Sequence, residues 1–151
     1  MKLDELLPLL KQRIDSAKAE QRPLDHILLC GPRDLTLEAL SYVSAQAQVR
    51  MSVFEAAAYH ESGNLGVTLT HLSNGSILHI DEIHCLDKYN VLTLRTAMQD
   101  FVLPIVTGKG PQQKKVSLPL ARFSVLATTT RPTLLPYELH THFPVEYQIS
   151  R

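Results

Sequence analysis

The sequence predicts a three-layer α/β domain with a five-stranded parallel sheet and an inserted β-hairpin. Short apolar runs alternate with segments of helical periodicity, which is typical of strand–helix–strand units. The apolar runs lack the polar alternation of half-exposed strands, as is typical of strands buried on both faces. Near position 102 the alternation gives way to two short apolar stretches around a glycine-rich turn, which favours a hairpin. A chain of 151 residues is long enough for one core, so we expect a single domain over 1–151.

The first half of the chain is predicted to begin with a helix over 3–20. Leu3, Leu6, Leu10 and Ile14 recur on one helical face, and Pro8 is expected to bend this helix or to move its start. The other elements expected in this half are a strand over His26 to Cys30, a helix over Leu35 to Ala47, a strand over Val49 to Val53, a helix over Gly63 to Leu72 and a strand over Ser76 to Ile80.

The second half should contain the hairpin, at about 102–119, and the last two strands of the sheet. Its turn is expected at Gly108 to Pro111, where two glycines and a proline favour a mobile tip. The expected elements are a helix over Lys88 to Phe101, hairpin strands over Val102 to Val106 and Val116 to Leu118, a strand over Phe123 to Ala127, a helix over Leu134 to His142 and a strand over Val145 to Ile149.

Composition excludes several classes of protein. Fifteen Lys plus Arg balance fifteen Asp plus Glu, which argues against charge-driven disorder and against binding nucleic acid by bulk phosphate neutralisation. No apolar run approaches 18 residues and acids occur near the amino terminus, so neither membrane insertion nor secretion is expected. The two cysteines, Cys30 and Cys85, are too few for a disulfide framework, which favours a cytoplasmic location.

The loop after the first strand is a degenerate phosphate-binding motif. A P-loop needs G-x-x-x-x-G-K-[ST], in which glycines turn backbone N–H groups toward the phosphates, lysine contacts the terminal phosphates and a hydroxyl binds magnesium. This chain keeps the first glycine as Gly31, followed by Pro32. Thr36, Leu37 and Glu38 stand at the second glycine, the lysine and the hydroxyl. Gly31, Pro32, Leu37 and Glu38 therefore mark a doubtful cofactor site.

Two adjacent acids follow the third predicted strand, in the segment Ile77-Leu-His-Ile-Asp-Glu-Ile-His84. In nucleotide hydrolases with a Walker B motif, the first acid holds the magnesium shell and the second polarises the attacking water. Asp81 and Glu82 match these two positions, so this half of the hydrolytic machinery is present in the sequence.

Four segments in order resemble the AAA+ ATPase core of the RuvB family, the motors of Holliday-junction branch migration, and the match runs nearly end to end. They are Pro23-Leu-Asp-His-Ile-Leu-Leu-Cys-Gly-Pro32, Ile80-Asp-Glu-Ile-His84, Ala97-Met-Gln-Asp-Phe101 with Ile105-Val-Thr-Gly-Lys-Gly-Pro111, and Ala127-Thr-Thr-Thr-Arg131. The resemblance implies a P-loop NTPase fold, a Walker B pair at Asp81 and Glu82, and a sensor at Thr129 or Thr130. It also implies that the hairpin contacts RuvA, the junction-binding partner.

The chain departs from the family pattern where nucleotide chemistry occurs. The arginine finger, which contributes about 10³ to 10⁵ in rate, falls on His142. A lysine about 4 Å from a phosphate contributes on the order of 4 kcal/mol, and Leu37 lacks it. The segment that helps to enclose adenine is missing or short, and the family's lid and winged-helix domains have no counterpart. We therefore expect weak ATP binding and no independent catalysis.

Several residues admit a structural interpretation as well as a functional one. Asp81 and Glu82 could be inherited acids that are solvated or cap a loop. His79, His84 and Cys85, and His140 with His142, show no recognised zinc spacing, and His79 is expected on the opposite strand face from Asp81, so no metal site is expected. Lys109, Lys114 and Lys115 could contact phosphates or only solvate the hairpin tip. The apolar hairpin residues Ile105, Val106, Val116 and Leu118 could bind a partner or pack on the domain.

The sequence thus supports a RuvB-like domain that works through protein contacts in DNA recombination or repair and needs no cofactor. Its expected partner is a RuvA-like or RuvB-like protein bound at the hairpin, in a possible ring oligomer, with DNA reached only indirectly. An alternative is an ATP- and magnesium-dependent subunit that is active only in a mixed ring with a catalytic partner. A third is a regulator unrelated to DNA that binds another apolar groove.

Overall fold

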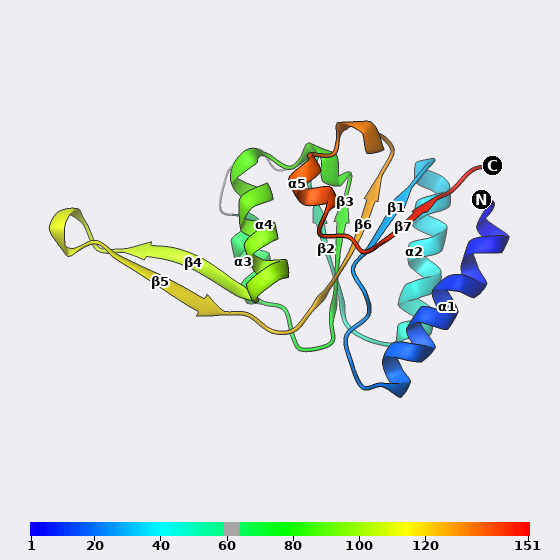
Figure 1. Ribbon diagram of the computed structural model, residues 1–151, viewed down its shortest axis with the longest axis horizontal. Coiled ribbons are helices and arrows are strands. Elements are labelled where there is room, and N and C mark those ends of the chain that lie inside the picture. Colours follow the sequence, from blue (N-terminus) through cyan, green and yellow to red (C-terminus); the bar gives the residue numbers. More distant parts are fainter. Residues whose placement is uncertain (59–63) are drawn as a thin grey trace.

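A parallel sheet forms the centre of the computed structural model, which describes residues 1–58 and 64–151 (Figure 1). Its strands are β1 (Ile27–Cys30), β2 (Met51–Glu55), β3 (Ile77–Asp81), β6 (Ser124–Thr129) and β7 (Val145–Gln148). They lie in the order β2-β3-β6-β1-β7, and every neighbouring pair is parallel. The predicted fold class, a five-stranded parallel sheet with an added hairpin, is confirmed.

Helices cover both faces of this sheet. They are α1 (Leu3–Ala19), α2 (Arg33–Ala47), α3 (Asn64–Thr70), α4 (Lys88–Asp100) and α5 (Tyr137–His140), with short 3-10 turns at Ile83–Cys85, Gly110–Gln112 and Pro132–Leu134. Helices α1 and α2 cover one face, and α3, α4 and α5 cover the other (Figure 1). None of the helices in the described ranges combines the length and apolarity needed to span a bilayer.

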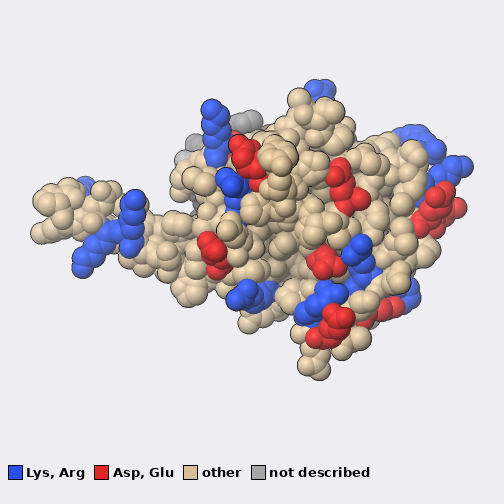
Figure 2. Space-filling view, viewed as in Figure 1, with Lys and Arg blue, Asp and Glu red and all other residues tan. Residues whose placement is uncertain are grey.

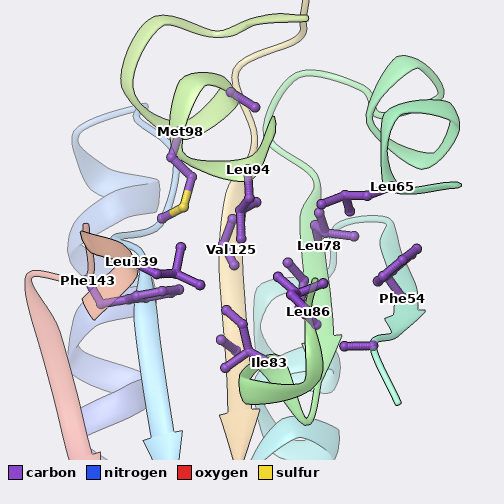
Figure 3. Packing of buried hydrophobic residues seen from close by; sticks show 14 of the residues in the cluster. Phe54, Leu65, Leu78, Ile83, Leu86, Leu94, Met98, Val125, Leu139 and Phe143 are labelled. Atoms are coloured by element: carbon purple, nitrogen blue, oxygen red, sulfur yellow. The ribbon is translucent and has the colours of Figure 1, made fainter. Parts of the chain in front are cut away.

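The strands bury both of their faces, which explains their continuous apolar runs. Successive side chains of a strand point to opposite sides, so Leu28 contributes to the core beneath α3 to α5, whereas Ile27 and Leu29 pack toward α1 and α2. Figure 3 shows Leu78 and Val125, on adjacent strands, facing Leu94 of α4. The carboxyl-terminal ends of β1, β3 and β6 are thereby fixed relative to one another.

Several predicted boundaries were wrong. Strand β2 runs over Met51–Glu55 rather than from Val49, because Gln48 ends α2 in the left-handed conformation and residues 49–50 connect the two elements. Strand β6 extends to Thr129. The helix expected over 134–142 shrinks to Tyr137–His140 because proline restricts the residue before it, and Pro136 interrupts the pattern. Pro8 lies inside α1, which begins before it. The predicted start at Gly63 lies outside the described residues.

The hairpin projects from the domain as a two-stranded antiparallel ribbon of β4 (Val102–Thr107) and β5 (Lys114–Pro119) (Figure 1). Ile105 pairs with Val116 and Val106 pairs with Lys115. Directly paired residues share a face and neighbours along a strand do not. The four apolar hairpin residues therefore do not share one face: Val106 lies opposite Ile105, Val116 and Leu118.

The base of the hairpin rests on the domain. Leu103 is 8% exposed, and a Cβ on Gly66 of α3 would lie 3.6 Å from its methyl groups. Beyond this contact, Ile105 and Leu118 line a groove with Val67 and Tyr89 of α3 and α4. The Ile105 face thus adjoins the body of the domain, whereas Val106 is 55% exposed and points away from that groove.

Candidate functional site

The sequence-predicted acids and threonines meet at the carboxyl-terminal edge of the sheet. Asp81 ends β3, Thr129 ends β6, and Gly31 directly follows β1. These three strands are adjacent in the order β3-β6-β1, and ligands of open parallel sheets bind beyond this edge. The structure therefore brings Asp81, Glu82, Thr129, Thr130 and the Gly31 loop to one place.

The segment aligned with the phosphate loop is helical. Helix α2 begins at Arg33, two residues earlier than predicted, with Pro32 as its N-cap. The backbone N–H groups of Leu35 and Thr36 donate to the Pro32 carbonyl at 3.1 and 3.0 Å. These donors lie inside the segment where a P-loop would turn its N–H groups toward phosphate. The Thr36 hydroxyl is also engaged, since it donates to the Arg33 carbonyl at 3.0 Å.

The other side chains of the phosphate-loop segment either pack on the core or lie at the surface. Leu37 packs against the core between α1, α2 and the sheet. Glu38 is exposed, and Asp34 forms a bidentate pair with Arg151, with N···O distances of 2.9 and 3.0 Å. This hydrogen bonding lowers the pKa of Asp34. None of these three side chains reproduces the lysine or hydroxyl of a P-loop.

Gly31 is required by the packing of the chain itself. Its φ is +152°, and a Cβ would lie 2.5 Å from the carbonyl oxygen of Ile149, just beyond β7. Two backbone hydrogen bonds hold the Gly31 backbone between the ends of β6 and β7. Gly31 N–H donates to the Thr129 carbonyl, and Ile149 N–H donates to the Cys30 carbonyl at 2.7 Å. A backbone approach this close leaves no room for a side chain.

Both carboxylate oxygens of Asp81 have protein partners. Oδ2 lies 2.8 Å from Nη2 of Arg33, and Oδ1 accepts a hydrogen bond from the Thr128 hydroxyl at 3.1 Å. Asp81 is 6% exposed, and a buried carboxylate needs such partners. The first residue of α2 thus supplies the positive charge that faces Asp81.

A buried histidine extends this network. His79 Nε2 lies 3.0 Å from the Thr128 hydroxyl, whose single hydrogen is donated to Asp81. Nε2 therefore carries the proton and donates to Thr128, and Nδ1 has no hydrogen-bond partner among the residues that the structure describes. The prediction that His79 and Asp81 face opposite sides of β3 was wrong, because residues two apart on a strand share a face. Burial lowers the pKa of His79 to about 4.

Glu82 accepts two hydrogen bonds from Thr130. Its Oε1 accepts from the Thr130 N–H at 3.0 Å and its Oε2 from the Thr130 hydroxyl at 2.7 Å. The backbone of Glu82 is left-handed, with φ of 51°, which turns its side chain toward the end of β6. Thr129 instead faces His84, whose Nδ1 lies 2.7 Å from its hydroxyl. Of the two candidate sensor threonines, Thr130 is therefore the one that contacts Glu82.

Residues at other predicted positions form no cluster of metal ligands. Across 1–58 and 64–151, the His, Cys, Asp and Glu side chains form no group of three or more placed to hold a metal ion. His84 lies 3.7 Å from Glu82, and His140 pairs with Glu146 at 2.6 Å. His142, at the arginine-finger position, follows α5 and is half-buried.

Comparison with known proteins identifies the family of this fold and site. A family model described as the Holliday junction DNA helicase RuvB P-loop domain matches residues 3–149. The chain belongs to this RuvB family. RuvB of Acidothermus cellulolyticus, the Holliday junction branch migration complex subunit, is 40% identical over 131 residues, 86% of this chain.

Solved RuvB structures share the fold along the whole chain. A Thermotoga maritima RuvB point mutant superposes with a TM-score of 0.84 at 26% identity, over 99% of this chain and 46% of its own. The Thermotoga maritima RuvB branch migration motor gives a TM-score of 0.77 at 27% identity, over 98% of this chain and 44% of its own. This RuvB-family chain spans 36% of the curated Acidothermus relative and less than half of either solved chain.

Sequence reasoning missed three residues of this RuvB-family site. Arg33 and Thr128 contact Asp81, and His84 contacts Thr129, yet none occupies a nucleotide-binding position of the motif. Arg33 offered one signal, because it is the only cation in the degenerate loop 31–38. Thr128 lies beside the predicted sensor, but the register that pairs Ile80 with Ala127, and so sets Thr128 next to Asp81, is a property of the folded sheet.

Proposed function

We propose that this chain is a RuvB-family domain that binds protein partners and does not hydrolyse ATP. The observation that carries the proposal is the helical start of α2 at Arg33. A phosphate-binding loop needs N–H groups that point at the ligand, whereas those of Leu35 and Thr36 donate to Pro32. The site does not fit a magnesium nucleotide, since both oxygens of Asp81 are also engaged.

The catalytic positions support the same proposal. Glu82 accepts two hydrogen bonds from Thr130, which competes with orienting a water for attack. His142 replaces the arginine finger and lacks the bidentate guanidinium that stabilises transferring phosphate. The lysine position is Leu37, which packs into the core. Binding and catalysis therefore fail at separate residues.

Isothermal titration with Mg²⁺-ATP tests this proposal directly. We expect no heat of binding at millimolar nucleotide, because Leu37 stands at the lysine position and the N–H groups of Leu35 and Thr36 donate to the Pro32 carbonyl. Titration of a catalytically intact RuvB under the same conditions is the positive control. Micromolar affinity of this chain for ATP would refute the proposal.

The hairpin is the surface that we assign to a RuvA-like partner. Its Ile105 face carries Ile105, Val116 and Leu118 and continues into the groove beside Val67 and Tyr89. Apolar surface of this kind, on a projecting ribbon, is typical of protein-binding sites. The partner would then contact the DNA in place of this chain. The symmetry of the partner would fix the arrangement of subunits in any ring oligomer.

Charge placed on the Ile105 face should abolish this interaction. We expect Ile105→Asp to weaken binding of RuvA at least tenfold, because an aspartate would lose its hydration in an apolar contact. Val106→Asp is the matched control, since it adds the same charge on the opposite face of the same strand. Surface plasmon resonance with immobilised RuvA measures both. Equal loss in the two variants, or loss in neither, would contradict the assignment.

A mixed ring is the second candidate function, favoured by one observation. Asp81, Glu82 and Thr130 remain assembled at the sheet edge, where an active neighbour could use them. Steady-state ATPase assays of a RuvB protein with added chain test this. If the alternative holds, the chain stimulates turnover and Glu82→Gln removes the stimulation. Our proposal expects no dependence on Glu82.

A further inference from the structure

The polar network at the carboxyl-terminal edge of the sheet contains its own cation. Asp81 is 6% exposed, and a buried carboxylate in this fold needs a positive partner. In nucleotide hydrolases with a Walker B acid that partner is the magnesium shell. In this chain the Arg33 guanidinium lies 2.8 Å from Asp81 Oδ2. Arg33 comes from the segment that has lost the phosphate-binding loop.

We propose that Arg33 is a built-in replacement for the divalent cation at Asp81, so that the site is complete without metal or nucleotide. This inference rests on the proposed function. It names Arg33 as the residue that keeps the folded domain stable when no magnesium nucleotide is bound. A RuvB-like site that lost only its lysine and glycine would leave Asp81 buried and unpaired. Arg33 removes that penalty.

Local structure holds Arg33 in this role. It is the first residue of α2, directly after the N-cap Pro32, and its carbonyl accepts from the Thr36 hydroxyl at 3.0 Å. The early start of the helix is what brings residue 33 to the end of β3. Oδ1 of Asp81 is held separately by Thr128, so the carboxylate keeps one orientation whichever cation faces Oδ2.

The guanidinium remains partly solvated. The Arg33 side chain is 53% exposed and that of Asp81 is 8% exposed, so the pair lies at the mouth of the site with its acid inside. Removal of the guanidinium therefore opens Oδ2 to solvent cations without exposing the core. A small divalent ion is the occupant that this carboxylate would take, since hard oxygen ligands suit Mg²⁺ and Mn²⁺.

Thermal unfolding with and without divalent cation tests the proposal. The melting temperature of the wild-type chain should be the same in about 20 mM Mg²⁺ as in NaCl of equal ionic strength. Arg33→Met should melt about 5 °C lower, and Mg²⁺ should restore a measurable part of this loss. Arg33→Lys, which keeps the charge, should stay close to wild type and show no response to Mg²⁺.

A second variant separates the charge of Asp81 from the packing of Arg33. In Arg33→Met with Asp81→Asn, the unpaired buried charge is gone, so stability should recover toward wild type and the response to Mg²⁺ should vanish. A fully stable Arg33→Met, or a Mg²⁺ response that persists without the Asp81 carboxylate, would overturn the proposal. So would a wild-type chain stabilised by Mg²⁺ alone. None of these readouts contains ATP, so failure here is distinct from ATP binding by the wild type, which would refute the proposed function.

Discussion

Replacing Gly31 by alanine should destabilise the domain by about 3 kcal/mol or more. The added Cβ would lie 2.5 Å from the Ile149 carbonyl oxygen, and the φ of +152° at this residue adds backbone strain for any residue with a Cβ. The nearest atom is a backbone oxygen and not the end of a flexible side chain, so the backbone at residue 149 must move to relieve the clash. Urea unfolding followed by circular dichroism measures the loss.

Gly75→Ala is the matched control for this prediction. Gly75 also has positive φ, at +80°, but nothing lies within 4 Å of its added Cβ. It should therefore cost only the strain of the conformation, about 1–2 kcal/mol. If Gly31→Ala were no more damaging than Gly75→Ala, the close approach of residue 149 would not explain why this glycine persists in a loop that has lost its other motif residues.

The unfolding free energy should fall by about 3 kcal/mol as the pH drops from 6.5 to 4, through His79 alone. Burial lowers the pKa of His79 in the folded chain from 6.5 to about 4. The unfolded chain therefore binds a proton first, and the stability present above pH 6.5 is lost as the pH falls toward the folded value. Urea unfolding at half-unit pH steps gives the slope.

His79→Leu isolates the contribution of this residue. Leucine removes the titrating ring and keeps an apolar body in the core, while the Thr128 hydroxyl still donates to Asp81. We expect the slope of stability between pH 6.5 and 4 to decrease by up to one proton. A residual slope of the same sign should persist, because burial also lowers the pKa of His26. An unchanged slope in His79→Leu would contradict the assignment.

The fold was predictable because its signals are local and repeated. Each sheet strand is buried on both faces and therefore appears as an uninterrupted apolar run, as in Ile27–Cys30. Boundaries failed where backbone geometry rather than hydrophobicity decides them. Gln48 adopts a left-handed conformation that no apolar pattern reveals, and this moved the start of β2. Pro136 also delays the start of α5, which the apolar periodicity predicted to begin at Leu134.

The site was half predictable. Asp81, Glu82, Thr129 and Thr130 could be expected together because motif and order place them at adjacent strand ends. The partners of Asp81 could not be predicted. The contact between Arg33 and Asp81 depends on the residue at which α2 begins, and the helix begins about half a turn earlier than its apolar pattern indicates. The error on His79 was one of strand parity, which the sequence itself specifies.

The hairpin strands pair only with each other among the described residues, so each outer side of the ribbon offers unpaired backbone groups to any extended chain. Such edges invite self-association into larger sheets. This ribbon carries the usual deterrents: Pro104 lacks an amide hydrogen on β4, and Lys114 and Lys115 place like charges on β5. Figure 2 shows Lys or Arg side chains on the projecting ribbon, and residues 101–137 contain no Asp or Glu. The like charges of two copies would therefore oppose edge-to-edge pairing of their ribbons.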